Sequence, residues 1–215
     1  MATSNATKAG LFIFLGALQF AMAVLVSEIL YSAYGTLRHA GQGNTTGYVY
    51  SVSVNAISDL GANCTGSVCT IPPSAYLFDV SVVILGVMLM AGAFYLNRAF
   101  HWMPAAVMFA LAGVGAIGVG IFPETAGYVH HIFTLVAFLP AGLAGIVGAR
   151  LAKKPFFYFS IILGLATLVA MFLYVGMEYA GLGQGGMERM VVYPAVFLAL
   201  GFGGHLIGRD DWPKA

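Results

Sequence analysis

The residues in this sequence whose types suit chemistry are carboxylates and histidines that flank long apolar stretches. Ionisable groups in such places are costly, so they mark candidate sites. They are Glu28, Asp59, Asp79, Glu124, His130, His131, Glu178 and Glu188, with Arg189 beside them. A catalytic metal needs three protein ligands and an open position for water. We predict that Asp59, Asp79 and His131 hold a divalent metal or act as acid and base, and that Arg189 meets an anionic head group.

The pattern around these residues leaves the cofactor open. The sequence has no HExxH or similarly spaced pair of ligands. His131 and His205 fall at opposite ends of their apolar stretches, which argues against a haem held by two axial histidines. Adjacent helical residues project about 100° apart, so only one of His130 and His131 points into a bundle. Either could be the one, and we take His131.

A structural interpretation of the same residues competes with the catalytic one. Acids and histidines at helix ends form ion pairs and caps that fix a loop on a bundle. Glu28 would then pair with Arg38 or Arg189. Asp79, which follows a Pro-Pro-Ser break, would favour the positive end of a helix dipole.

The composition sets the class of protein that must position these residues. Of 215 residues, 60% are hydrophobic and only 8% charged, whereas soluble domains carry about a quarter charged residues. A soluble globular enzyme is therefore excluded. Nine Lys and Arg against eight Asp and Glu give a net charge of +1, which offers no basic face to nucleic acid.

Six apolar stretches are long enough to cross a bilayer, which needs roughly 20 apolar residues per helix. They run approximately from Gly10 to Tyr34, Ala75 to Leu96, Trp102 to Phe122, Val129 to Ala149, Phe156 to Met177 and Val191 to Ile207. We predict an all-α, polytopic membrane protein with six transmembrane helices in a single integral membrane domain, residues 1–215. Glycines stud the third, fourth and sixth stretches, and we expect them to allow close approach of helix backbones.

Positive charges predict the orientation, because cytoplasmic loops retain Lys and Arg. Only Arg38 and Arg189 fall on one side of the six-span arrangement, and the other seven fall on the opposite side. We expect both termini to be cytoplasmic, in a multi-pass protein of the cell membrane. The extracytoplasmic segments are then a long loop at about 35–74, the turn 123–128 and the loop 178–190.

The long loop carries features typical of an extracytoplasmic segment. It contains both cysteines of the chain, Cys64 and Cys69, and disulfides persist outside the cytosol. We predict that the two form a disulfide, with two unpaired buried thiols as the alternative. Asn44 and Asn63 begin N-glycosylation acceptor patterns in the same loop.

Short motifs spread over nearly the whole chain resemble a known family. They are Asn55-Ala-Ile-Ser-Asp-Leu-Gly61, Pro72-Pro73, Phe78-Asp79, Gly118-Val-Gly-Ile-Phe-Pro123 followed by His130 and His131, and Gly186-Met-Glu-Arg-Met190. In order and spacing they resemble the DUF998 family of six-helix prokaryotic membrane proteins. More distantly, Ile-Ser-Asp followed by a proline and an aromatic residue is similar to the Frag1/DRAM/Sfk1 membrane proteins, some of which are linked to lipid remodelling.

The resemblance implies a fold and a shared polar site on the extracytoplasmic side, and it implies no established activity. The implied site residues are Asn55, Ser58, Asp59, Glu124, His131, Glu188 and Arg189. The resemblance also implies Asn in many relatives where this chain has Asp79, which adds a negative charge to the site.

Residues 57–61, Ile-Ser-Asp-Leu-Gly, have the composition of a short turn at the membrane interface. Ser58 and Asp59 can cap a helix end or bond their own backbone, and Gly61 permits a positive φ. Docked over the bundle, this turn would bring Asp59 near His131 and Arg189.

No motif decides whether the protein is an enzyme. The leading chemistry is that of a lipid-directed hydrolase or transferase, with Asp59, Asp79 and His131 as catalytic residues and membrane lipid as the partner. Its substrate would contact Asn55, Ser58, Glu28, Glu124, Glu188 and Arg189. One alternative is a structural or accessory subunit of a membrane complex or homo-oligomer, in which glycine-rich helix faces bind partners. A small-solute transporter is disfavoured because the six spans show no evident inverted repeat.

Overall fold

The computed structural model describes residues 3–34, 50–61, 63–65, 68–70 and 73–208. Six long helices account for most of them: α1 (Asn5–Tyr34), α2 (Ser74–Phe100), α3 (Met103–Ile121), α4 (Tyr128–Gly148), α5 (Phe156–Val175) and α6 (Gly183–Ile207). The short 3-10 helices are η1 (Ser58–Leu60), η2 (Glu124–Ala126) and η3 (Ala149–Leu151). Each of the six α-helices is long and apolar enough to span a membrane, as the sequence predicts.

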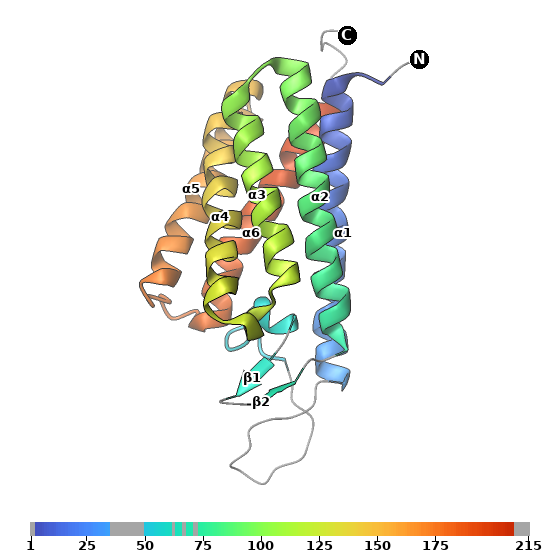
Figure 1. Ribbon diagram of the computed structural model, residues 1–215. Helices are drawn as coiled ribbons and strands as arrows, with labels where there is room; N and C mark the ends of the chain where they lie inside the picture. The colour runs from blue at the N-terminus through green and yellow to red at the C-terminus, as the bar shows by residue number, and fades with distance from the viewer. Residues whose placement is uncertain (1–2, 35–49, 62, 66–67, 71–72, 209–215) are drawn as a thin grey trace.

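The six helices form one bundle in which neighbours in the chain are neighbours in space (Figure 1). Each α-helix packs against the next, and α6 returns to pack against α1. The beginning of α1 and the end of α6 lie at the same end of the bundle, called here the terminal end. The opposite end, called the loop end, carries residues 50–61 and the connections from α3 to α4 and from α5 to α6.

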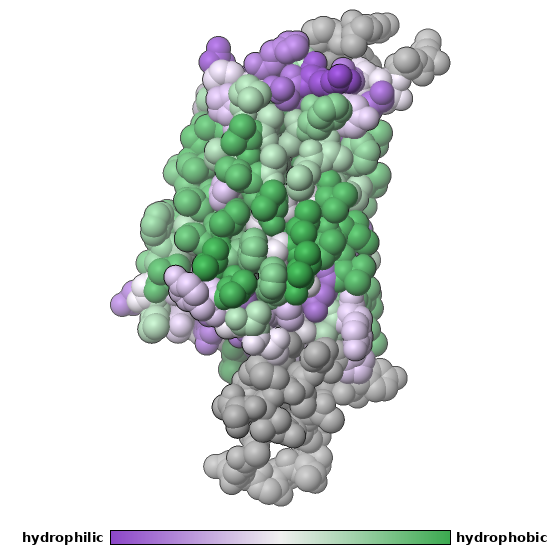
Figure 2. All heavy atoms as spheres, viewed as in Figure 1, coloured by the Kyte–Doolittle hydropathy of each residue, from purple (hydrophilic) through white to green (hydrophobic). Residues whose placement is uncertain are grey.

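On the face of the bundle seen in Figure 2, apolar side chains cover the middle and polar side chains collect at the two ends. Ile29, Val87 and Phe172 each leave more than half of their surface exposed. A belt of such residues is suited to lipid, because in water it would promote aggregation. Inside the bundle, Ile13 and Phe202 are fully buried. The fold is therefore that of a multi-pass membrane protein.

Glycines bring the helices into close contact, as the sequence predicts. A Cβ atom added at Gly86 of α2 would lie 2.5 Å from the carbonyl oxygen of Gly113 on α3, and one added at Gly113 would lie 2.6 Å from that of Gly86. Gly10 of α1 and Gly203 of α6 face each other in the same way. Lipid supplies no hydrophobic drive between helices, so such contacts stabilise the bundle by van der Waals attraction.

The start of α6 differs from the prediction. The apolar pattern begins at Val191, but the helix begins at Gly183, so Glu188 and Arg189 lie on the helix and not in a loop. Hydropathy misses the first two turns because the run Gly-Gln-Gly-Gly-Met-Glu-Arg is polar and glycine-rich. Residues 50–58 supply partners to its charged side chains, as described below.

The predicted all-α class is confirmed by the six-helix bundle, to which the loop end adds one small β-hairpin. β1 (Asn63–Thr65) pairs antiparallel with β2 (Val68–Thr70), and Cys64 lies directly opposite Cys69. Opposed residues in such a pair have Cα atoms about 4.5–5.5 Å apart, a separation that a disulfide can span. The backbone is compatible with the predicted bridge, which stays a prediction. Glycosylation at Asn63 also stays a prediction, and Asn44 lies outside the described residues.

Candidate functional site

Residues 50–61, called here the capping segment, cover the loop end of the bundle. The side chain of Glu188 on α6 accepts hydrogen bonds from Ile57 and Ser58 of this segment. Glu188 Oε2 accepts a hydrogen bond from the N–H of Ile57 at 2.7 Å, and Oε1 accepts one from the N–H of Ser58 at 3.3 Å. The free N–H groups at the start of η1 thereby receive the acceptor that a helix N-terminus needs. Glu188 is separated from Ile57 by 131 positions in the sequence.

Arg189 holds the rest of the capping segment. Its Nη1 donates to three backbone carbonyl oxygens, those of Val52 at 3.0 Å, Asn55 at 2.7 Å and Gly185 at 2.9 Å. Its Nη2 donates to Glu28 Oε1 at 2.9 Å and to the Tyr50 hydroxyl. Only 6% of the Arg189 side chain is exposed. Both terminal nitrogens are bonded within the protein, and contact of Arg189 with an anionic head group stays a prediction.

The contacts of Arg189 join three parts of the chain. Its ion pair with Glu28 links α6 to α1 and is one of the two pairings that the sequence predicts for Glu28. Arg38, the other predicted partner, lies outside the described residues. Tyr50 also donates to the carbonyl oxygen of Ala56 at 3.1 Å. Burial raises the pKa of Tyr50 well above its ordinary value, so this hydroxyl keeps its proton.

Asp59 organises the capping segment from within, as the turn prediction expects. Its Oδ2 accepts hydrogen bonds from Asn55 Nδ2 at 3.0 Å and from the N–H of Ala56 at 3.1 Å. Asn55 Oδ1 in turn accepts one from the N–H of Ser51 at 3.0 Å. The side chains of Asn55 and Asp59 therefore fix the loop conformation, and the Asn55 carbonyl connects that loop to Arg189.

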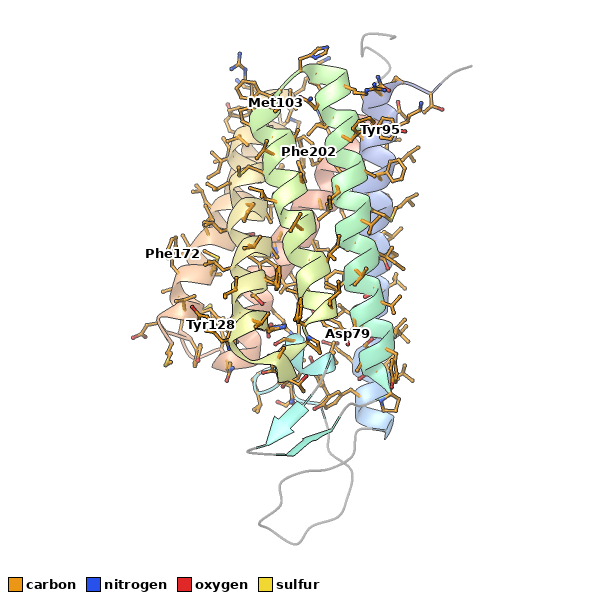
Figure 3. The ribbon with its side chains drawn as sticks, in the orientation of Figure 1. Asp79, Tyr95, Met103, Tyr128, Phe172 and Phe202 are labelled. Atoms are coloured by element: carbon orange, nitrogen blue, oxygen red, sulfur yellow. The ribbon has the colours of Figure 1, made fainter. Side chains whose placement is uncertain are left out.

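Gly61 and Asp79 meet where the capping segment leaves the bundle. Gly61 has a φ of −78°, so the positive φ that glycine permits is not used here. A Cβ atom at Gly61 would lie 2.5 Å from Asp79 Oδ1, so a larger residue would require the Asp79 side chain to move. Asp79 lies near the loop end of α2, beyond its first turn (Figure 3). Its Oδ1 is buried and has no hydrogen-bond partner among the residues that the structure describes.

Glu124, in the turn between α3 and α4, places a second carboxyl group next to that of Asp59. Glu124 Oε2 is buried without a donor in the described part of the chain. A second carboxylate nearby disfavours the charged form of the first, because like charges repel. Burial, followed by the neighbouring Asp59 carboxyl, raises the pKa of Glu124 to about 9. At neutral pH Glu124 is therefore the protonated member of the pair.

We expect Glu124 to make the protein less stable at alkaline pH. Its pKa is raised from 4.5 to about 9, so the folded state binds this proton more tightly than the unfolded state. The resulting stabilisation is complete below about pH 4.5 and is lost as the pH rises through about 9. The thermal midpoint in lipid nanodiscs should fall over this window. Glu124→Gln should flatten the fall, and Glu178→Gln, which changes an exposed acid, should not. An equal fall in Glu124→Gln and wild type would contradict this role.

His130, and not His131, faces the interior of the bundle. His130 is 4% exposed, and its Nδ1 lies 2.8 Å from the carbonyl oxygen of Phe122. His131 is exposed, so the choice of His131 as the inward residue is wrong. The cause lies at the end of α3, where the Phe122 carbonyl follows the last helical residue and lacks a helical donor. His130 supplies that donor and thereby sets the register of α4.

The predicted metal ligands are not brought together as a metal site. Within the described ranges, no three side chains of His, Cys, Asp or Glu are grouped so as to hold a metal ion. Asp59 is bonded inside the capping segment, Asp79 lies against Gly61, and His131 is exposed. A divalent metal held by these three residues and a catalytic role for them stay predictions.

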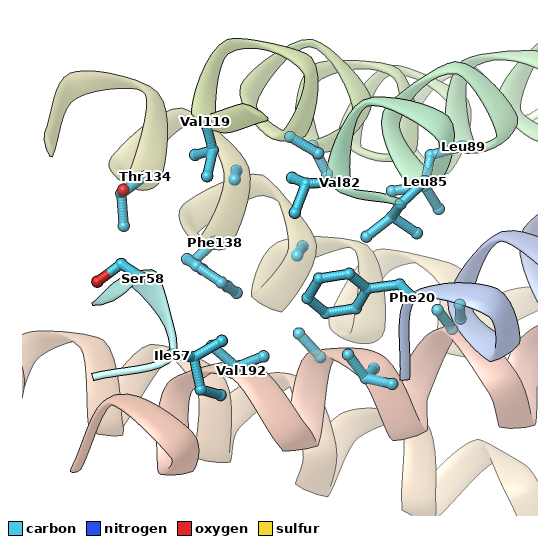
Figure 4. Close-up of a pocket in the computed structure, with 18 of the residues that line it drawn as sticks. Phe20, Ile57, Ser58, Val82, Leu85, Leu89, Val119, Thr134, Phe138 and Val192 are labelled. Carbon is cyan, nitrogen blue, oxygen red and sulfur yellow. The ribbon is translucent and has the colours of Figure 1, made fainter. Parts of the chain in front are cut away.

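A cavity of about 100 Å³ lies inside the bundle beneath the capping segment (Figure 4). Four polar side chains line its loop end: Ser58, His130, Thr134 and Glu188. The remaining lining is apolar and extends between the helices to Leu89, Phe109 and Leu198. Ser58 and Thr134 appear at one end of the close-up, and Leu85 and Leu89 at the other. The cavity is therefore amphipathic along its length.

Three residues of this region were missed by reasoning from the sequence. His130 was the residue not chosen of an adjacent pair. Thr134 has a readable signal, since it follows His130 by four positions and so shares its helix face. Tyr50 carries no local signal, because its partner Arg189 is 139 positions away.

Comparison with known proteins gives a family and no activity. No curated protein and no solved structure matches the chain. The family model described as "Protein of unknown function (DUF998)" matches residues 44–205. This range includes the capping segment and α2 to α5, together with nearly all of α6. The more distant similarity to the Frag1/DRAM/Sfk1 proteins stays a prediction. With most of its length matched and six membrane-spanning helices, the chain belongs to the DUF998 family.

Proposed function

We propose that this protein binds the alkyl chain of a single-chain amphiphile inside its helix bundle. The observation that supports the proposal is the cavity, which is apolar along most of its length and polar at the loop end. Ligand sites commonly combine an apolar lining with a few placed polar groups. An amphiphile has the same division into chain and head group. If the loop end is extracytoplasmic, as the charges predict, the head group lies on that side.

The size of the cavity suits a short chain. A water-sized group fills on the order of 10–15 Å³, so a space of about 100 Å³ takes roughly seven to ten such groups. A chain of about ten carbons is therefore a suitable probe. Apolar cavities stay dry, and their walls lack partner atoms when empty. An alkyl chain would supply those contacts without displacing bound water from the apolar part.

A lipid-directed hydrolase or transferase is the second candidate, because it would use the same kind of ligand. Its support is His130, whose Nδ1 is held by the Phe122 carbonyl while the ring lines the cavity. Nε2 is then the nitrogen that could accept a proton from a substrate. It stays a prediction that Asp59, Asp79 and His131 are catalytic. The two alternative functions, an accessory subunit and a transporter, also stay predictions.

Filling the cavity should abolish chain binding. Val82 of α2 lines the cavity and is buried, whereas Val87 of the same helix is 54% exposed. We expect decanol to raise the thermal midpoint of wild type and of Val87→Phe in lipid nanodiscs, because a ligand that binds the folded state stabilises it. Val82→Phe should lose this rise.

The matched pair separates binding in the cavity from a general effect on the bilayer. An equal rise in Val82→Phe and Val87→Phe would show that decanol acts on the lipid, and would contradict the proposal. If Val82→Phe does not fold, Ala195→Leu makes a smaller insertion at another position in the lining.

A further inference from the structure

The polar side chains at the loop end of the cavity mainly offer hydrogen-bond acceptors to a ligand. The Thr134 hydroxyl donates to the carbonyl oxygen of His130 at 2.9 Å, so its hydrogen is used and its oxygen lone pairs remain. The Ser58 hydroxyl lines the same end of the cavity and also has oxygen lone pairs. Both hydroxyls can therefore accept a hydrogen bond from a ligand, and that of Thr134 has no free hydrogen to donate.

His130 and Glu188 add further acceptors. The Phe122 carbonyl can only accept, so His130 Nδ1 carries the hydrogen and Nε2 of the neutral ring is an acceptor. Both oxygens of Glu188 accept hydrogen bonds from backbone N–H groups and keep further lone pairs. Each polar residue of the described lining thus offers lone pairs to a ligand, and the hydrogens of Thr134 Oγ1 and His130 Nδ1 are already engaged.

The charges near this end of the cavity favour the same kind of ligand. The described lining contains no Lys or Arg. Arg189 follows Glu188 directly but is bonded to the capping segment and to Glu28, outside the lining. Asp59, an acid of the capping segment, lies close enough to interact electrostatically with Glu188. An anionic head group would be buried near Glu188 without a counter-charge, which is costly.

We infer that the amphiphile has a head group that donates hydrogen bonds, a hydroxyl or a primary amine, and not a phosphate, sulfate or carboxylate. This inference rests on the proposed function, since it assumes that the alkyl chain occupies the apolar part of the cavity. The head group then lies among Ser58, His130, Thr134 and Glu188 and donates to their lone pairs.

Four probes with the same ten-carbon chain test the inference in lipid nanodiscs. Decanol and decylamine carry donors, decyl methyl ether is neutral without a donor, and decyl sulfate is an anion without a donor. The dissociation constant of each comes from the rise of the thermal midpoint with probe concentration, corrected by the response of Val82→Phe. We expect decanol and decylamine to bind roughly tenfold or more tightly than the other two.

The two proposals fail in different ways. If no probe stabilises wild type more than it stabilises Val82→Phe, the proposed chain binding is wrong. If all four bind equally, or if decyl sulfate binds most tightly, chain binding stands and the inferred head group is wrong.

A matched pair of threonines tests where the head group lies. Thr134 and Thr167 each donate to the carbonyl four residues earlier, at 2.9 and 3.0 Å, but only Thr134 belongs to the described lining. Thr134→Val should reduce the advantage of decanol over decyl methyl ether, and Thr167→Val should leave it unchanged. A loss in both variants, or in neither, would overturn the placement.

Discussion

Replacing Arg189 with Met is expected to destabilise the protein by about 3–5 kcal/mol, the cost of removing one partner of a buried ion pair. The change leaves the Glu28 carboxylate without its charge partner and deprives the carbonyls of Val52 and Asn55 of their donor. The loss should appear as a lower unfolding midpoint in mixed micelles. The capping segment should also become a site of rapid proteolysis, because its main attachment to α6 is gone.

Arg98→Met provides the matched control for this prediction. Arg98 is an exposed arginine on α2 whose guanidinium lies 4.9 Å from the centre of the Phe94 ring. An exposed cation–π contact is worth about 0.5–1 kcal/mol, so this variant should unfold close to wild type. A cost for Arg189→Met no larger than that for Arg98→Met would contradict the described role of Arg189. A double-mutant cycle with Glu28→Gln then measures the part of the cost that belongs to the ion pair.

The second large effect is expected from a single methyl group at Gly115. A Cβ atom there would overlap the backbone nitrogen and Cα of Ala137 on α4. Backbone atoms cannot move aside as a flexible side chain does, so α3 and α4 would have to separate. Overpacking of this kind costs about 1–3 kcal/mol and occasionally more. We expect Gly115→Ala to lie at the upper end of that range in the same unfolding experiment.

Gly204→Ala makes the same chemical change where space is available. A Cβ atom at Gly204 of α6 would have its nearest neighbour, Phe14 Cδ2, at 3.8 Å, which is ordinary contact. Both substitutions replace a helical glycine by alanine and gain the same helix propensity. A difference in stability therefore measures the contact between α3 and α4. Equal stability of the two variants would show that this contact is looser than described.

The six helices follow from the sequence because a bilayer demands long apolar runs and every backbone group must be bonded within the helix. The same reasoning places the end of α1 at Tyr34 and the beginning of α5 at Phe156. It misplaces the start of α6, because hydropathy takes no account of partners. Glu188 and Arg189 are polar in the sequence but have all but one of their polar atoms bonded in the structure.

The candidate site depends on features that a linear pattern does not contain. Whether His130 or His131 faces the interior of the bundle depends on one carbonyl group, that of Phe122 at the end of the preceding helix. Asp59 was predicted to bond its own backbone, and it does, because that interaction is local. The cavity could not be predicted, since it is an absence of packing that depends on the side chains of five helices at once.

The bond between Glu28 and Arg189 joins positions separated by 161 in the sequence. During synthesis, α1 enters the membrane long before α6 exists. In that interval Glu28 is an acid without its partner, and Ile57 and Ser58 lack the carboxylate that receives their N–H groups. A chain that ends before α6 therefore lacks the partners of Glu28 and of the capping segment. Arrival of the last helix supplies both sets of partners at once, so the loop end is completed only when the last helix has been made.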